Sequence, residues 1–157
     1  MLKRILDQNT QNSSLSIQHW LDAEALAQVE VTSEDPAYPI ESGLLPRSGP
    51  GWRAAQPGPQ IVRLVFDSPQ LIKRLHLEFD ETELNRTQQF VLRWSSDRGN
   101  SYQEIVRQQY NFNPSGATRE CEDYSVNLVD VTTLELAIIP DISGGPARAS
   151  LSQLRFA

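Results

Sequence analysis

The segment Gly51–Phe66 reads Gly-Trp-Arg-Ala-Ala-Gln-Pro-Gly-Pro-Gln-Ile-Val-Arg-Leu-Val-Phe, and it determines the class of fold that the sequence predicts. A turn-rich beginning that carries Trp52 leads into a Pro-Gly-Pro corner. An alternating segment follows, with Val62, Leu64 and Phe66 at every second position. Because successive side chains of a β-strand point to opposite faces, this alternation predicts a strand with one buried face.

Similar alternating segments follow and precede this strand, separated by clusters of turn residues. They occupy residues 27–33, 71–79, 90–95, 102–110, 124–128, 133–139 and 149–156. The sequence Asp67-Ser-Pro69 predicts a tight turn, and residues 96–100 predict a hairpin loop. About eight strands with almost no helix predict an all-β protein, and sandwich, barrel and jelly-roll architectures all fit this pattern.

The apolar positions of these segments predict the hydrophobic core. Within residues 71–79, the spacing predicts that Leu71, Leu75, Leu77 and Phe79 face inward. The same reasoning gives a set of expected buried residues: Val62, Leu64, Leu75, Leu77, Leu92, Leu136 and Ile138. A chain of 157 residues can bury roughly two thirds of its unfolded surface, so we expect one domain over residues 1–157.

The first 26 residues differ in pattern from the rest. Residues 1–14 are polar and predict an arm, whereas residues 16–26 repeat apolar side chains at helical spacing behind Ser16, a favourable N-cap. We therefore expect a short helix over Ser16–Leu26, anchored by Trp20 against a β-sandwich formed by residues 27–157.

The totals restrict the possible partners and compartments. The net charge of −6 disfavours nucleic-acid binding, which usually requires a basic stripe. No apolar run approaches the ~20 residues of a membrane span, and the N-terminus lacks the apolar core of a signal peptide. Cys121 is the only cysteine, which excludes an intrachain disulfide and favours a reducing compartment, so we expect a cytoplasmic protein.

Several strings, in this order, resemble the discoidin or coagulation factor 5/8 type C family, a galactose-binding-like β-sandwich that also contains many carbohydrate-binding modules. The strings are Trp52-Arg-Ala, Gly58-Pro-Gln-Ile-Val-Arg-Leu-Val-Phe, Pro69-Gln-Leu-Ile-Lys-Arg-Leu-His-Leu-Glu-Phe, Phe90-Val-Leu-Arg-Trp-Ser-Ser-Asp-Arg-Gly and Leu151-Ser-Gln-Leu-Arg-Phe. The resemblance implies a single antiparallel jelly-roll β-sandwich that binds ligands through loops at one end.

The resemblance also implies where a structural calcium ion would be held, and the sequence departs from that pattern. Ser42-Gly43 stands where many relatives have Asp-Gly, and Gln153 replaces an acidic residue of the last strand. Because calcium requires several oxygen ligands with negative charge among them, a calcium site is disfavoured, and we expect no cofactor or metal.

The sequence contains no catalytic constellation. His19 and His76 lack any local catalytic signature and are interpreted as surface imidazoles. Cys121 lies between Glu120 and Glu122, whose charge would raise a thiol pKa and blunt its reactivity. The acidic run Glu78, Asp80, Glu81 and Glu83 is interpreted as a solvated loop, so we expect a protein that is not an enzyme.

The candidate binding groups lie in loops. The connections Glu34–Gln60 and Asn111–Asp123 are the longest, and we expect them at the same end of the sandwich, because long loops on a rigid scaffold often bind ligands. Their aromatic rings and arginines, with a third polar loop, suit sugar hydroxyls and ring faces. The candidates are Tyr38, Arg47, Trp52, Arg53, Asn85, Arg86, Tyr110, Phe112 and Arg119. For Trp52 a core position is the alternative, and for Tyr110 and Phe112 it is packing of their own loop.

Two functions remain open from the sequence. The first is a non-catalytic module that binds carbohydrate through these loops, as the resemblance implies. The second is an intracellular module of the same fold that binds another protein, which fits the single cysteine and the absence of an export signal.

Overall fold

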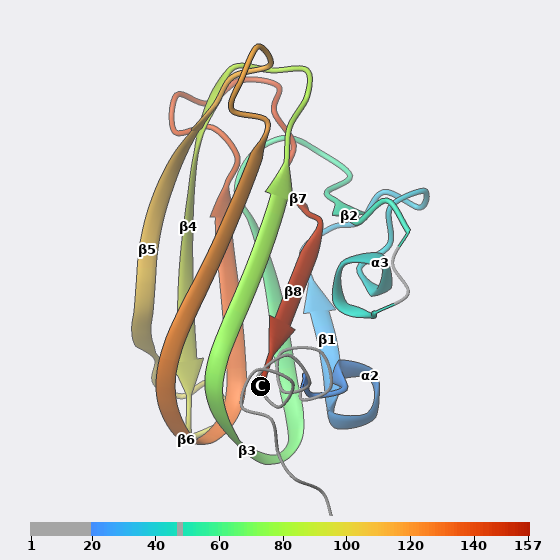
Figure 1. Ribbon diagram of the computed structural model, residues 1–157. Coiled ribbons are helices and arrows are strands. Elements are labelled where there is room, and N and C mark those ends of the chain that lie inside the picture. The colour runs from blue at the N-terminus through green and yellow to red at the C-terminus, as the bar shows by residue number, and fades with distance from the viewer. Residues whose placement is uncertain (1–19, 47–48) are drawn as a thin grey trace, which may run out of the picture.

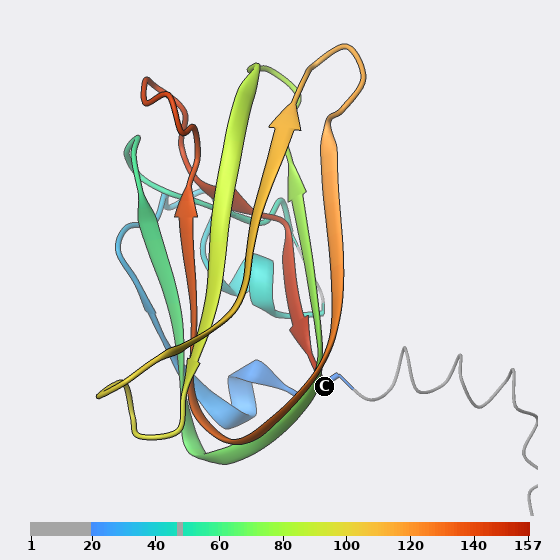
Figure 2. The ribbon, with the colours of Figure 1, turned by 90° about the vertical axis from the view of Figure 1, so that its left-hand side faces the viewer.

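The computed structural model describes residues 20–46 and 49–157, and it is a β-sandwich of two antiparallel layers (Figures 1 and 2). The expected arm over residues 1–14, the proposed cap Ser16, His19 and Arg47 lie outside the described residues. The expectation of an all-β sandwich with about eight strands is confirmed, since the described strands run from β1 to β8.

Two long strands, β3 (Gln60–Asp80) and β6 (Arg119–Ile139), form the frame of both layers. They pair antiparallel from Gln60 opposite Ile138 to Asp80 opposite Arg119. Shifts of register between Val65 and Arg74 interrupt this ladder, and there both strands curve from one layer into the other (Figure 2). Each strand therefore contributes one half to each layer.

The first layer has the strand order β1-β3-β6-β4-β5, with β1 (Ala27–Val31), β4 (Arg86–Ser95) and β5 (Gln103–Phe112). In the second layer β8 (Gln153–Phe156) pairs with the C-terminal half of β3. The short strands β2 (Trp52–Arg53) and β7 (Ser150–Leu151) pair with each other.

Four predictions about the strands are corrected. The tight turn at Asp67-Ser-Pro69 is absent, because the exposed Pro69 lies within the register shift, where the missing N–H costs no ladder hydrogen bond. The segments 124–128 and 133–139 are likewise parts of one strand. Strand β4 begins four residues before the predicted Phe90. Because β6 begins at Arg119, the predicted loop Asn111–Asp123 shortens to residues 113–118.

The described part of the predicted helix Ser16–Leu26 is also corrected. Trp20 and Leu21 are not helical, and the N–H of Leu21 donates to the carbonyl of Phe156 at 2.7 Å. Helix α2 (Ala23–Leu26) starts only after Asp22, whose carboxylate accepts the N–H groups of Glu24 and Ala25 and thereby caps the first turn. Helix α3 (Glu41–Leu44) is equally short, and no helix in the described part of the chain is long and apolar enough to cross a membrane.

The core lies between the two layers, and all seven residues predicted to be buried are buried. Leu71 is the exception among the inward-facing predictions for residues 71–79, since half of its surface is exposed while Ile72 is fully buried. The irregular pairing around Ile72 moves the buried face from even positions, such as Phe66, to odd positions, such as Leu75.

Truncation of Leu77 tests this assignment. Leu77 is completely buried and pairs with Leu154 of β8, so Leu77→Ala should lower the free energy of unfolding by about 2–5 kcal/mol through lost burial and a cavity. Chemical denaturation measures the change. Val129→Ala, at a position that is 54% exposed, is the control and should have an effect of less than about 0.5 kcal/mol. Equal stability of the two variants would show that the inward face is misassigned.

Candidate functional site

A shallow polar groove lies beside the C-terminal end of β3. Figure 1 shows that this end of β3 lies beside β7, away from the C-terminus of the chain. It consists of two adjoining hollows of about 140 and 170 Å³. Both hollows are lined by Arg53 of β2, by residues of the β3–β4 turn and by Ser150 of β7. The groove therefore joins the predicted connection Glu34–Gln60 to two segments that are distant in sequence.

Tyr38 and Arg53 are brought together by a tight turn. The carbonyl of Asp35 accepts the N–H of Tyr38 at 2.8 Å, and the Asp35 carboxylate accepts the N–H of Ala37 at 3.0 Å. The carbonyl of Tyr38 then accepts the N–H of Arg53 at 3.1 Å. As a result the Arg53 guanidinium lies over the Tyr38 ring, 4.6 Å from its centre. Two of the predicted binding residues thus place an aromatic ring and a guanidinium group side by side.

Trp52 precedes Arg53 and points the opposite way. Its side chain is only 1% exposed, and the indole N–H donates to the carbonyl of Ser33 at 3.1 Å. Because neighbouring residues of a strand face opposite sides, the buried Trp52 fixes the exposed position of Arg53. Trp52 is thus a core residue, the alternative considered from the sequence, and it presents no indole surface to a ligand.

The opposite wall of the groove is acidic and was missed as a site by the sequence analysis. Asp80, Glu81 and Glu83 line it, together with Ser150. The Asp80 carboxylate accepts the hydroxyl of Ser152, and Glu83 is exposed. The acidic run was a signal, but nothing in the sequence places the end of β3 beside β2 and β7.

Glu81 holds the turn in shape. Burial raises the pKa of its carboxyl, but hydrogen bonds from the backbone N–H of Glu83 and from Arg86 outweigh that effect and bring the pKa below its ordinary value. Glu81 therefore remains ionised and supports the wall of the groove.

Three further candidates lie at the same end but outside the groove. The buried Arg86 donates to Glu81 at 2.7 Å and to the carbonyl of Pro140 at 2.7 Å, and it stacks on the ring of the buried Phe112 at 4.6 Å. Tyr110 packs against Phe112, with ring centres 4.9 Å apart, and donates to the carbonyl of Arg119 at 2.9 Å. The contacts of Arg86, Tyr110 and Phe112 therefore stabilise the β3–β4 and β5–β6 turns.

The last two described candidates differ in their contacts. Asn85 is exposed in the β3–β4 turn. Arg119 pairs with Glu78 on the outer face of the second layer and lies 3.9 Å from a carboxylate oxygen of Asp80. The β5–β6 turn and residues 54–59 lie at the same end of the sandwich, as predicted, but only the connection Glu34–Gln60 contributes to the groove (Figure 2).

The segment around Ser42 is organised by a side-chain oxygen. The buried Ser42 hydroxyl accepts the N–H groups of Gly49 and Gly51, each at 3.0 Å. These hydrogen bonds tie together the loop where the resemblance would place a calcium ion. In residues 20–46 and 49–157, no group of three or more His, Cys, Asp or Glu side chains is arranged to hold a metal ion.

The fold is similar to that of several solved carbohydrate-binding modules. No family model matches the sequence, and no curated protein matches it either. Solved structures do match. The family 32 module of Clostridium perfringens NanJ, in complex with galactose, has a TM-score of 0.63 and 12% identity over 87% of this chain and 96% of that chain.

Two other solved modules match in the same way. A Clostridium perfringens module in complex with GalNAc-β-1,3-galactose has a TM-score of 0.59 and 17% identity, over 87% of this chain and 98% of that chain. A pectin-binding module has a TM-score of 0.60 and 15% identity, over 83% and 89%. At these identities the likeness establishes the fold, and the ligand has to be argued from the residues of the groove.

A buried polar seam between β4 and β6 has a consequence for stability. Gln88 and Glu120 are both almost fully buried, and Gln88 donates to Glu120 at 3.1 Å. Burial and the neighbouring carboxylate of Glu122 raise the pKa of Glu120 from 4.5 to about 8. The folded state therefore holds a proton on Glu120 that the unfolded chain releases above about pH 4.5.

Stability should consequently fall as the pH rises from about 5 to 8, because over this range the folded state binds more protons than the unfolded state. Glu120→Gln, which keeps the shape without the titration, should flatten this dependence and be more stable than the parent at pH 8 by about 1 kcal/mol or more. Denaturant titrations at several pH values measure the effect. Exposed Glu104→Gln is the control, and an unchanged slope in Glu120→Gln would contradict the assignment.

Proposed function

We propose that the chain is a non-catalytic carbohydrate-binding module and that the groove around Arg53 binds a neutral sugar. The observation that carries the proposal is the Arg53 guanidinium stacked on Tyr38 and facing the acidic turn at the end of β3. This combination supplies what sugars require: an aromatic surface for their C–H groups and oriented polar groups for their hydroxyls.

Each group has a distinct part in binding. The carboxylates of Asp80 and Glu83 accept hydrogen bonds from sugar hydroxyls, and the fork of Arg53 donates to hydroxyl or ring oxygens. The contact between Arg53 and Tyr38 restricts both side chains before binding, which lowers the entropic cost of ordering them. The binding of galactose and of GalNAc-β-1,3-galactose by modules of this fold supports the choice of ligand class.

Electrostatics favour a neutral sugar over an acidic one. Three acidic side chains line the groove against the cations Arg53 and Arg148. Arg148 lies 3.6 Å from Asp35, and Glu81 is engaged by Arg86. Arg119 lies 3.9 Å from Asp80 but is shared with Glu78, so the remaining balance at the groove is still negative. A ligand with its own carboxylate would face Asp80 and Glu83, and like charges at close range disfavour binding.

The groove lacks the arrangement of a glycosidase. A general acid needs a carboxyl whose pKa is raised within the site, yet hydrogen bonds lower the pKa of Glu81. Among the described carboxyls, Glu120 has a raised pKa, and it lies in the buried seam outside the groove. The proposal is therefore binding without catalysis.

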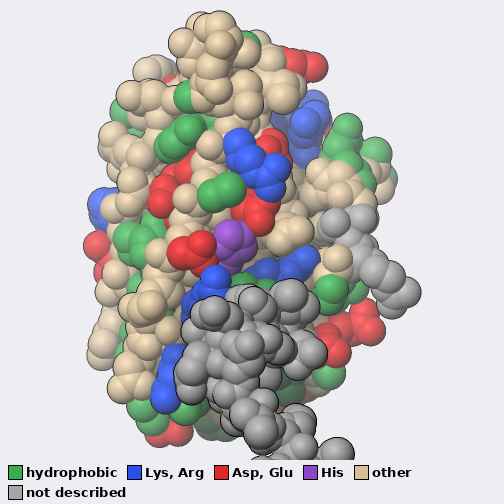
Figure 3. All heavy atoms as spheres, in the orientation of Figure 1, with side chains coloured by type: hydrophobic (Ala, Val, Ile, Leu, Met, Phe, Trp, Pro, Cys, Tyr) green, Lys and Arg blue, Asp and Glu red, His purple; other side chains and the backbone are tan. Residues whose placement is uncertain are grey.

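Protein binding, the alternative from the sequence, is less well supported. The outer face of the second layer carries acidic and basic side chains around a histidine (Figure 3). Its groups engage one another: His76 lies 2.7 Å from Glu78, Arg119 pairs with Glu78, and Arg74 lies 3.3 Å from Asp123. Paired charges of this kind leave little for a protein partner to neutralise.

Substitution of the stacked pair tests the proposal. A glycan array identifies a neutral ligand, and calorimetric titration measures its affinity. Arg53→Ala and Tyr38→Ala should each weaken binding by roughly fivefold or more, about 1 kcal/mol, because each removes a central contact. Exposed Arg107→Ala, on β5, is the matched control and should leave affinity unchanged. Unchanged affinity in both groove variants, with the fold intact, would place the site elsewhere.

A further inference from the structure

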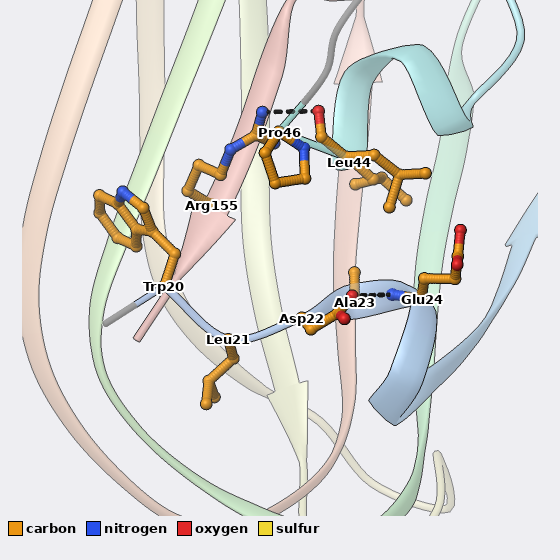
Figure 4. Close-up of a pocket in the computed structure, with 9 residues that line it drawn as sticks. Trp20, Leu21, Asp22, Ala23, Glu24, Leu44, Pro46 and Arg155 are labelled. Atoms are coloured by element: carbon orange, nitrogen blue, oxygen red, sulfur yellow. Dashed lines mark hydrogen bonds between the residues drawn. The ribbon is translucent and has the colours of Figure 1, made fainter. Parts of the chain in front are cut away.

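We propose a second binding site, in the cavity between β8, α2 and α3, that takes a sugar bearing a carboxylate, a uronic-acid unit, with Arg155 as its counter-charge. The cavity has a volume of about 610 Å³ (Figure 4). It has no lining residue in common with the groove. The inference therefore does not rest on the proposed function of the groove.

Arg155 is the main reason to expect an anion. It belongs to β8, its residue surface is only 7% exposed, and its guanidinium donates to the carbonyls of Leu154 at 3.1 Å and Leu45 at 2.8 Å. None of the carboxylates in residues 20–46 and 49–157 lies within 4 Å of it as a salt-bridge partner, although most other described arginines have one. Burial alone lowers the pKa of Arg155, as expected for a desolvated charge.

A carboxylate would satisfy this guanidinium. Arginine carries five N–H donors in a planar fork, and backbone carbonyls occupy only part of them. A bidentate carboxylate matches the geometry of the fork and supplies the opposite charge that no carboxylate of the described residues provides.

The walls of the cavity indicate the rest of the ligand. Figure 4 shows Arg155, Pro46 and Leu44 in a row along one edge of the cavity, with Trp20 at the end nearest Arg155. Arg74 stacks on the Trp20 ring at 4.6 Å and fixes its orientation. An aromatic ring with an aliphatic wall suits the C–H surface of a saturated ring better than it suits a small, fully hydrated anion.

The far side of the cavity selects for hydroxyl groups. Asp22 and Glu24 lie there, opposite Arg155 (Figure 4). Their oxygens accept hydrogen bonds from hydroxyls, but their charge repels a second negative group. Both carboxylates are exposed, and Asp22 also caps α2, so solvent screens their charge more than that of the buried Arg155. A monoanion that carries hydroxyls therefore fits better than a dianion such as phosphate. The volume suits one or two sugar units.

The experiment is a titration of the full 157-residue chain with sodium galacturonate, followed by calorimetry or by shifts of backbone amide signals. Galacturonate should bind, and added salt should weaken it. Arg155→Gln should reduce its affinity at least tenfold, as should Trp20→Ala, which leaves the guanidinium in place. Arg107→Gln is the charge-matched control and should have no effect.

The two sites are distinguished by crossed variants and ligands. Arg155→Gln should leave the neutral ligand of the groove unaffected, and Arg53→Ala should leave galacturonate unaffected. If Arg155→Gln fails to fold, as judged by circular dichroism, Trp20→Ala decides the question. The proposal is overturned if galacturonate does not bind, if neither variant weakens it, or if inorganic phosphate binds the cavity as tightly as galacturonate does.

Discussion

The pairing of β3 with β6 is the interaction on which the rest of the structure depends. The two strands remain hydrogen-bonded on both sides of their bend, so a single ladder spans both layers. Strands β1, β4 and β8 each attach to one of them and complete the sandwich. The irregular register between Val65 and Arg74 is necessary, because an unbroken alternation would turn the second half of the apolar face toward solvent.

This frame also sets the positions of the two proposed sites. The groove lies where β3 ends at Asp80, and β7 brings Ser150 to the same place. Ser152 connects the two strands, since its N–H donates to the carbonyl of Glu78 at 2.9 Å. The cavity lies at the other end of β8, where Arg155 pairs in register with His76 of β3. The pair of strands β3 and β6 thus positions both proposed sites, the groove with its excess of negative charge and the cavity around the buried Arg155.

The strands were predictable because apolar and polar residues alternate along a strand that buries one face. All seven residues predicted for the core are buried. The continuity of β3 was not predictable. Asp67-Ser-Pro69 has the composition of a turn, and only the tertiary pairing shows that the chain runs through it. The helix prediction was wrong for Trp20, Leu21 and Asp22, because it followed the apolar spacing and did not recognise Asp22 as the N-cap.

The candidate site was predictable in part for the same kind of reason. Tyr38 and Arg53 lie in one connection, and local turn chemistry brings them together. Asp80 and Glu83 were not predicted as site residues, because they line the groove only through the packing of β3 against the distant segments β2 and β7. Arg86 and Phe112 have the composition of loop residues that bind ligands, but burial makes them structural. By alternation Arg155 is an outward residue of β8, and its burial depends on the packing of α3, whose end at Leu45 accepts its hydrogen bond.

We propose that the end of the sandwich at β2, the β3–β4 turn and β7 binds a neutral sugar while the frame of β3 and β6 remains rigid. Backbone amide NMR signals followed through a titration with galactose or a galactose-terminated oligosaccharide test it most directly. We expect saturable shifts concentrated at residues 35–38, 53, 80–85 and 148–152, with small changes in the paired interior of β3 and β6. Shifts centred on the exposed face of β4 and β5, or no saturable shifts with any neutral sugar, would contradict it.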